Sequence, residues 1–187
     1  MPGWPGALDL KHIPNILTVV RLMLTPYVLY LLWQRQYPLV IGLFIAIALT
    51  DVADGYIARK FNAKSNVGAI LDPIADKTLL SGMFLVLAIT QSIDAWLVIV
   101  VLGRDVLILL GAGVLYLMGS RRRFPPSVWG KLSTFAQVLF VCFRLGVLAQ
   151  IPVEIVSVIL QWLVCALAVV SIADYARRTL PSAQPEA

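Results

Sequence analysis

The sequence predicts an all-α, polytopic membrane protein with six transmembrane helices. Of its 187 residues, 60% are hydrophobic and only 13% are charged, and the mean hydropathy is +0.88. A soluble domain typically has about 25% charged residues. Six apolar stretches approach or exceed the roughly 20 residues that a helix needs to cross the hydrocarbon core. Because only short connections are left between them, we expect one membrane domain over residues 1–187.

The six expected helices follow one another with polar or proline-containing breaks between them. The segment before the first helix lacks the shape of a cleavable signal and is compatible with a short surface helix at residues 7–12. Asp94 is expected to cap the start of the fourth helix. The helices are expected at about residues 14–33, 38–59, 68–90, 95–118, 128–149 and 153–175.

The distribution of Lys and Arg predicts the orientation of these spans. With the amino terminus in the cytoplasm, the inner segments hold nine basic residues and the outer connections hold only Arg35. This bias predicts a multi-pass protein with both termini cytoplasmic. The nine inner residues are Lys11, Arg59, Lys60, Lys64, Arg121, Arg122, Arg123, Arg177 and Arg178.

Several functional classes are disfavoured by composition. The net charge of +5 comes mostly from the one-sided loops, and no interleaved aromatic or groove-reading element accompanies it, so no nucleic-acid partner is expected. The single histidine, His12, has no cysteine or serine constellation beside it for a zinc site or a triad. Cys142 and Cys165 fall in the middle of expected helices and are predicted to be small core residues.

Four aspartates interrupt the second and third apolar stretches. Asp51 and Asp54 stand three residues apart, and Asp72 and Asp76 stand four apart, so each pair shares one side of a helix. Charges within a membrane span are costly and therefore indicate a function. Two such faces, if opposed, can hold hard divalent cations through oxygen ligands and leave coordination positions for a phosphate-bearing substrate. Under the predicted topology, this site lies toward the cytoplasm.

Each of these residues also has a structural interpretation. Gly55 or Gly68 alone is typical of close helix packing. Asp72 followed by Pro73 is typical of a helix N-cap with proline at the first helical position. The four aspartates together, around a basic connection, favour a site over these separate structural roles.

The two segments D-V-A-D-G-Y-I-A-R and G-A-I-L-D-P-I-A-D resemble the signature of the CDP-alcohol phosphatidyltransferase family, D-x-x-D-G-x-x-A-R followed by G-x-x-x-D-x-x-x-D. Four further segments, residues 13–21, 71–77, 103–105 and 129–137, are similar to segments of those members that make anionic phospholipids. Every fixed position of the signature is matched, by Asp51, Asp54, Gly55, Ala58, Arg59, Gly68, Asp72 and Asp76.

The resemblance implies that a phosphatidyl group passes from CDP-diacylglycerol to an alcohol and that CMP leaves. It implies that Asp51, Asp54, Asp72 and Asp76 hold one or two Mg²⁺ ions, with Mn²⁺ as the alternative, and that Asp76 is also the catalytic base. It further implies a homodimer. It assigns the CDP moiety to Asp54, Gly55, Ala58, Arg59 and Gly68, where small residues let the ligand approach the backbone and an arginine fork suits a phosphate.

The acceptor is expected to meet basic residues within or at the edge of the spans. Arg21, Arg104 and Lys131 are the candidates, and an internal ion pair with Asp105 is the alternative role of Arg104. Lys77 is expected to balance charge, because it points about 100° away from its neighbour Asp76. Arg144, nearer the outer end of its helix, is expected to extend toward water and headgroups.

Two acceptors remain open. We predict glycerol-3-phosphate, which would give phosphatidylglycerophosphate; the alternative is phosphatidylglycerol, the acceptor of the cardiolipin synthases of the same family. Enzymes that use glycerol-3-phosphate usually have a further arginine about two turns after the equivalent of Arg104, whereas this chain has Gly111, Ala112 and Gly113 there. A cation- or proton-coupled transporter is the alternative from another class, although transporters favour discontinuous helices in two matching halves.

Overall fold

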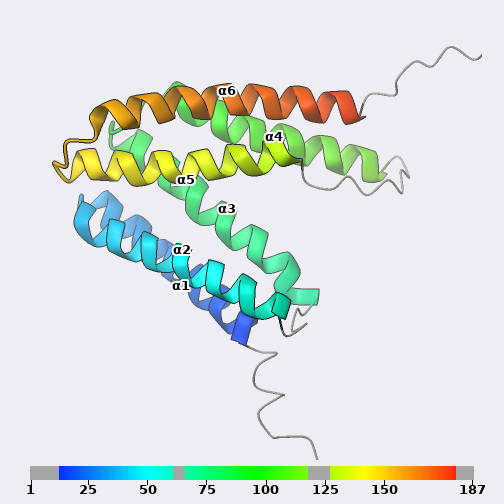
Figure 1. Ribbon diagram of the computed structural model, residues 1–187, viewed down its shortest axis with the longest axis horizontal. Helices are drawn as coiled ribbons and strands as arrows, with labels where there is room; N and C mark the ends of the chain where they lie inside the picture. The colour runs from blue at the N-terminus through cyan, green and yellow to red at the C-terminus, as the bar shows by residue number, and fades with distance from the viewer. Residues whose placement is uncertain (1–12, 61–65, 118–126, 180–187) are drawn as a thin grey trace, which may run out of the picture. The chain divides into compact units, whose positions relative to one another are not determined.

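The computed structural model describes residues 13–60, 66–117 and 127–179, and the side chains of residues 18–50, 75, 77–111 and 127–178. Within these residues the chain forms six helices and no strand (Figure 1). The predicted all-α class and number of helices are therefore confirmed. The helices are α1 (Ile13–Trp33), α2 (Tyr37–Lys60), α3 (Asn66–Ile89), α4 (Ala95–Leu117), α5 (Val128–Leu148) and α6 (Glu154–Thr179).

The helices coincide with the apolar stretches of the sequence, and Asp94 directly precedes α4 as expected. In the described part of the chain, two helices are long and apolar enough to cross a membrane, Val128–Leu148 and Glu154–Arg178. Shorter apolar helical segments cover Thr18–Trp33, Tyr37–Thr50 and Lys77–Ile89. Six transmembrane spans therefore stay a prediction. The expected surface helix at residues 7–12 lies outside the described residues.

The chain divides into two compact units, and the prediction of a single domain stays a prediction. Unit 1 comprises Met1–Thr90 with Leu148–Gln150, and unit 2 comprises Gln91–Val147 with Ile151–Ala187.

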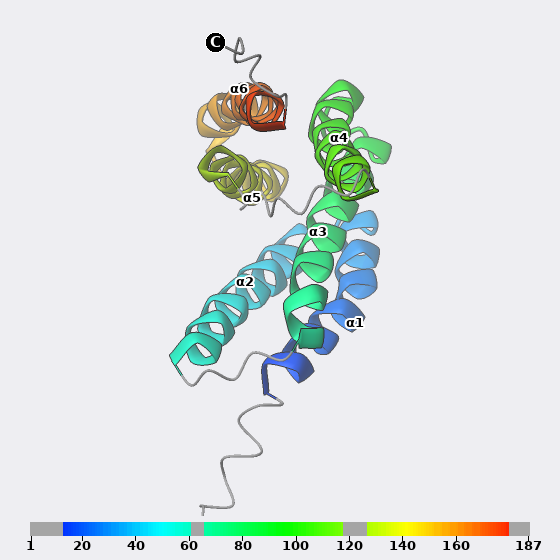
Figure 2. The same cartoon turned by 90° about the vertical axis from the view of Figure 1, so that its right-hand side faces the viewer.

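In unit 1, α1 packs against both α2 and α3 (Figure 2). The fully buried side chains of this packing include Val28 and Leu32 of α1 and Met83 and Phe84 of α3. Gly82 makes the contact between α1 and α3 close, because a Cβ atom there would lie 2.7 Å from Cδ1 of Leu29. The helix that carries Asp72 and Asp76 is thus held against α1 by apolar packing.

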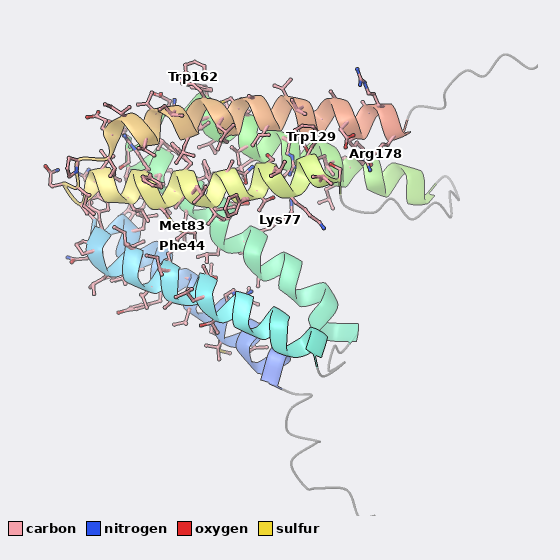
Figure 3. The ribbon with its side chains drawn as sticks, in the orientation of Figure 1. Phe44, Lys77, Met83, Trp129, Trp162 and Arg178 are labelled. Atoms are coloured by element: carbon pink, nitrogen blue, oxygen red, sulfur yellow. The ribbon has the colours of Figure 1, made fainter. Side chains whose placement is uncertain are left out.

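In unit 2, α4 packs against α6, and α5 runs beside α6 in both ribbon views (Figures 1 and 2). A glycine again sets the closest approach: a Cβ atom on Gly111 of α4 would lie 2.7 Å from Cε1 of Tyr175 on α6. The ring of Trp96, in the first turn of α4, lies 6.0 Å from the ring of Trp162, which is more than two turns into α6 and is exposed (Figure 3). Unit 2 therefore has a tight α4–α6 contact near the carboxyl ends of both helices.

Three helix ends use left-handed residues that are not glycine. Arg35, Gln91 and Gln150, which follow α1, α3 and α5, have φ values of 59°, 56° and 66°. After α1, the Gln36 N–H donates to the Leu31 carbonyl at 3.0 Å and so satisfies a carbonyl that the helix leaves open. These compact caps turn the chain back within a few residues and produce the short connections that the sequence predicts.

Candidate active site

The four motif aspartates lie toward the two helix ends that residues 61–65 connect. Asp54 stands six residues before the end of α2 at Lys60, and Asp72 stands six residues after the start of α3 at Asn66. At 1.5 Å per residue both are about 9 Å from the connection. By the same measure, Asp51 is about 14 Å and Asp76 about 15 Å from it. The backbone thus gives two pairs of aspartates at matched depths on consecutive helices.

The side chains of the signature lie outside the described ones, so their mutual geometry stays a prediction. Among the side chains that the structure does describe, no group of three or more His, Cys, Asp or Glu residues could hold a metal ion. The donor set of the motif nevertheless fits a hard divalent cation, because four carboxylates supply only oxygen ligands. The undescribed side chains are those of Asp51, Asp54, Gly55, Ala58, Arg59, Gly68, Asp72 and Asp76.

Arg21 belongs to the same unit as the aspartates. It lies two turns into α1, the helix that packs on both α2 and α3, and is only 4% exposed. Its carbonyl accepts a hydrogen bond from the Thr25 hydroxyl at 2.9 Å. A buried guanidinium needs acceptors around it, because an unpaired buried charge is costly, and this suits a position beside carboxylates or phosphates.

Arg104 is the centre of a polar cluster in unit 2. Its side chain is 6% exposed, and Nη1 donates to Oδ1 of Asp105 at 2.5 Å. Nη2 donates to the hydroxyl of Ser171 on α6 at 2.7 Å. The internal ion pair that the sequence offered as an alternative is therefore present. Nε is buried and has no hydrogen-bond partner among the described atoms, which leaves one donor of the fork for another acceptor.

Lys131 and Lys77 are both exposed. Lys131 lies in the first turn of α5, where its N–H donates to the Ser127 carbonyl at 3.1 Å. Lys77 extends from α3 (Figure 3). The exposed ammonium group of Lys131 can reach a surface anion, whereas Arg104 is held by its bonds to Asp105 and Ser171.

Arg144 differs from its expected position. Instead of extending toward water, it is half-buried and donates from Nε to the Ser92 carbonyl at 2.7 Å, with a second bond from Nη2 to the same oxygen. The prediction of an extended side chain is wrong, because this carbonyl in the connection before α4 needs a donor that the helices do not supply. Arg144 is a structural link between α5 and that connection.

Sequence reasoning missed Ser171 and Gly130. Ser171 is separated from Arg104 by 67 positions, so no local spacing relates the two residues. Gly130 lay inside a segment noted for its resemblance but had no role of its own. A buried serine in the apolar α6 was the only available signal, since a hydroxyl there needs a partner.

A comparison with known proteins agrees with the sequence signature. The model of the family described as CDP-alcohol phosphatidyltransferase matches residues 11–170. The chain is 30% identical over 182 residues to a probable phosphatidylglycerophosphate synthase of Mycobacterium tuberculosis, covering 94% of this chain and 85% of that protein. It is 31% identical over 172 residues to the CDP-diacylglycerol–glycerol-3-phosphate 3-phosphatidyltransferase of Aquifex aeolicus, covering 88% and 93%.

A shorter similarity points to another branch. A probable cardiolipin synthase (CMP-forming) of Drosophila melanogaster is 41% identical over 106 residues, which cover 56% of this chain and 33% of that protein. Because the family model spans most of the sequence, the chain belongs to the CDP-alcohol phosphatidyltransferase family. It is a phosphatidyltransferase of phospholipid synthesis, and its family depends on divalent metal ions.

Proposed function

We propose that the chain transfers the phosphatidyl group of CDP-diacylglycerol to glycerol-3-phosphate and releases CMP, which makes it a phosphatidylglycerophosphate synthase. The main support for this proposal is similarity along nearly the whole chain to relatives named for this reaction. One of them is the Aquifex aeolicus protein, which is 31% identical over 93% of its length. The eight matched signature positions supply the residues for the chemistry.

In this reaction the acceptor oxygen forms a bond to the phosphatidyl phosphorus, and the bond from that phosphorus to CMP breaks. Asp76 takes the proton of the acceptor hydroxyl. One or two Mg²⁺ ions held by Asp51, Asp54 and Asp72, with Asp76 beside them, would neutralise the pyrophosphate and the departing CMP. Arg59 contacts a phosphate of the donor through its fork.

Small residues complete the donor site. Gly55, Ala58 and Gly68 leave the backbone of α2 and α3 open to the cytidine and its phosphates. Asp54 contributes to the same site. These assignments rest on the family signature and on the positions of both segments near the connected ends of α2 and α3.

Arg21, Arg104 and Lys131 are proposed to bind the acceptor phosphate. The burial of Arg21 beside the motif helices and the open Nε donor of Arg104 support this assignment. The planar guanidinium of an arginine suits the binding of a phosphate.

A cardiolipin synthase that uses phosphatidylglycerol is the second candidate. It is favoured by the 41% identity over 106 residues to the Drosophila melanogaster relative. The surroundings of Gly111 also favour this candidate. Tyr175 fills the space beside Gly111, so the further arginine that glycerol-3-phosphate enzymes usually have in this neighbourhood would have no room there.

We further propose six membrane spans with both termini and the active site cytoplasmic, and a homodimer. The helices have 21 to 26 residues, which at 1.5 Å per residue gives about 32 to 39 Å and suffices to cross a bilayer of roughly 30 Å. The bias of basic residues toward one set of connections supports this orientation.

The decisive experiment supplies purified protein and CDP-diacylglycerol with glycerol-3-phosphate or phosphatidylglycerol, with and without Mg²⁺, and identifies the lipid formed. The proposal expects Mg²⁺-dependent CMP release and phosphatidylglycerophosphate. Cardiolipin formed only with phosphatidylglycerol would replace the first candidate by the second. No CMP with either acceptor would overturn both candidate acceptors.

A further inference from the structure

Three helices of unit 2 converge on the guanidinium of Arg104. Besides its bond to Asp105 on α4, this group bonds to the hydroxyl of Ser171 on α6 at 2.7 Å. On the α5 side, a Cβ atom added to Gly130 would lie 3.1 Å from Nη2 of Arg104 and 3.8 Å from Oγ of Ser171. The guanidinium is therefore held by one helix and given room by another.

The position of Ser171 is itself fixed. The residue is 2% exposed, and Tyr175, one turn later on α6, packs against Gly111 of α4. The backbone of Ser171 cannot move away from α4 without opening the α4–α6 contact, and its hydroxyl is held by the bond to Arg104. Its oxygen thus sets the direction of Nη2, while Asp105 sets the direction of Nη1.

With both terminal nitrogens engaged, rotation of the guanidinium plane is blocked, and the orientation of the buried, unpartnered Nε is fixed as well. A donor held in one direction binds an anion better than a freely rotating one, because less side-chain entropy is lost on binding.

We infer that Ser171 is a positioning residue that orients Arg104 toward the acceptor phosphate, and that Gly130 provides the space for this orientation. This inference rests on the proposed role of Arg104 in acceptor binding. It applies to glycerol-3-phosphate and to phosphatidylglycerol alike, because both carry a phosphate.

The test compares Ser171→Ala with Ser157→Ala in the purified full-length protein. Both serines lie on α6 and both are 2% exposed, so the two variants are matched in burial and chemistry. Ser171→Ala is expected to raise the KM for the acceptor roughly tenfold while kcat and the KM for CDP-diacylglycerol change less than about twofold. Ser157→Ala is expected to leave all three constants near wild type. Ser171→Thr, which keeps the hydroxyl, is expected to restore most of the acceptor affinity.

Gly130→Ala probes the same orientation without removing a polar group. Its methyl group must displace Nη2, and we expect the acceptor KM to rise several-fold while thermal stability is kept, because alanine is the better helix former. Gly42→Ala on α2 is the control, since nothing lies within 4 Å of a Cβ atom there. If the acceptor KM of Gly130→Ala equals that of Gly42→Ala, the proposed role of Gly130 is contradicted.

Arg104→Ala separates failure of the inference from failure of the proposed role. If Arg104→Ala leaves the acceptor KM unchanged, Arg104 does not bind the acceptor. If Arg104→Ala raises it but Ser171→Ala behaves like Ser157→Ala, only the positioning role is overturned. Adding Ser171→Ala to Arg104→Ala is expected to cause no further increase. A further tenfold increase would contradict action through Arg104.

Discussion

Units 1 and 2 differ in how their polar residues are arranged along the sequence. In unit 1 the acidic motif occupies the end of α2 and the start of α3, so all four aspartates fall within 26 consecutive residues. In unit 2 the polar contacts join distant positions, such as Arg104 with Ser171 and Arg144 with Ser92, 67 and 52 residues apart. Chemistry placed on two consecutive helices is visible as spacing, whereas chemistry shared among three helices is not.

The largest expected effect belongs to unit 1. Asp76→Asn removes the proposed base, and we expect CMP release to fall by about a thousandfold or more, because a general base typically contributes roughly 10² to 10⁴. Donor binding should be largely spared, as measured by CDP-diacylglycerol binding to the purified variant. Near-normal turnover would remove Asp76 from this role.

The substitution Arg59→Lys is expected to have the next largest effect. A lysine keeps the charge but loses the paired donors of the guanidinium, and we expect the KM for CDP-diacylglycerol to rise about tenfold. Steady-state kinetics with the donor varied at saturating acceptor would measure it. An unchanged donor KM together with a raised acceptor KM would move Arg59 to the acceptor side.

In unit 2 the expected effect of Arg144→Ala is on stability. The variant loses two hydrogen bonds from a charged donor to the Ser92 carbonyl, and we expect the free energy of unfolding to fall by about 2 kcal/mol. Thermal unfolding in detergent would measure this loss of stability. The KM values for both substrates are expected to stay unchanged. Arg178→Ala is the matched control, because its pair with Asp174 at 3.0 Å is 44% exposed on the arginine side and should contribute less than about 1 kcal/mol. Equal effects of the two variants would refute the link between α5 and the connection before α4.

The smallest expected effect tests the α4–α6 contact. Gly111→Ala places a methyl group 2.7 Å from Cε1 of Tyr175, and we expect a net loss of about 1 kcal/mol after the gain in helix propensity. Gly42→Ala, which meets nothing within 4 Å, should be neutral or slightly stabilising in the same thermal assay. A stabilised Gly111→Ala variant would mean that the two helices separate easily.

The fold class was predictable because each apolar stretch is long enough to be one helix and is bounded by polar residues or proline. Helix α6 shows the limit of this reasoning: it runs to Thr179, beyond the predicted end at residue 175, because polar residues near its end, such as Asp174 and Arg178, pair along the helix itself. The number of spans could not be confirmed from hydropathy within the described residues, since only α5 and α6 qualify.

The candidate site was likewise predictable from the sequence only in part. The aspartates and their depth from the α2–α3 connection follow from spacing, because a helix converts sequence separation into distance. The polar cluster around Arg104 could be recognised only in the structure, since Ser171 and Gly130 come from two other helices. Arg144 was misjudged for the same reason: a buried carbonyl that needs a donor cannot be recognised in the sequence.

We propose that aspartates from α2 and α3 hold one shared divalent metal site. Electron paramagnetic resonance of Mn²⁺ added to the purified protein tests it directly, with Asp51→Asn on α2 and Asp72→Asn on α3 as single variants. We expect bound Mn²⁺ in the wild type and a weakening of Mn²⁺ binding of about tenfold or more in each variant, because each removes a charged ligand from the same ion. Wild-type binding in either variant would contradict a site shared by the two helices.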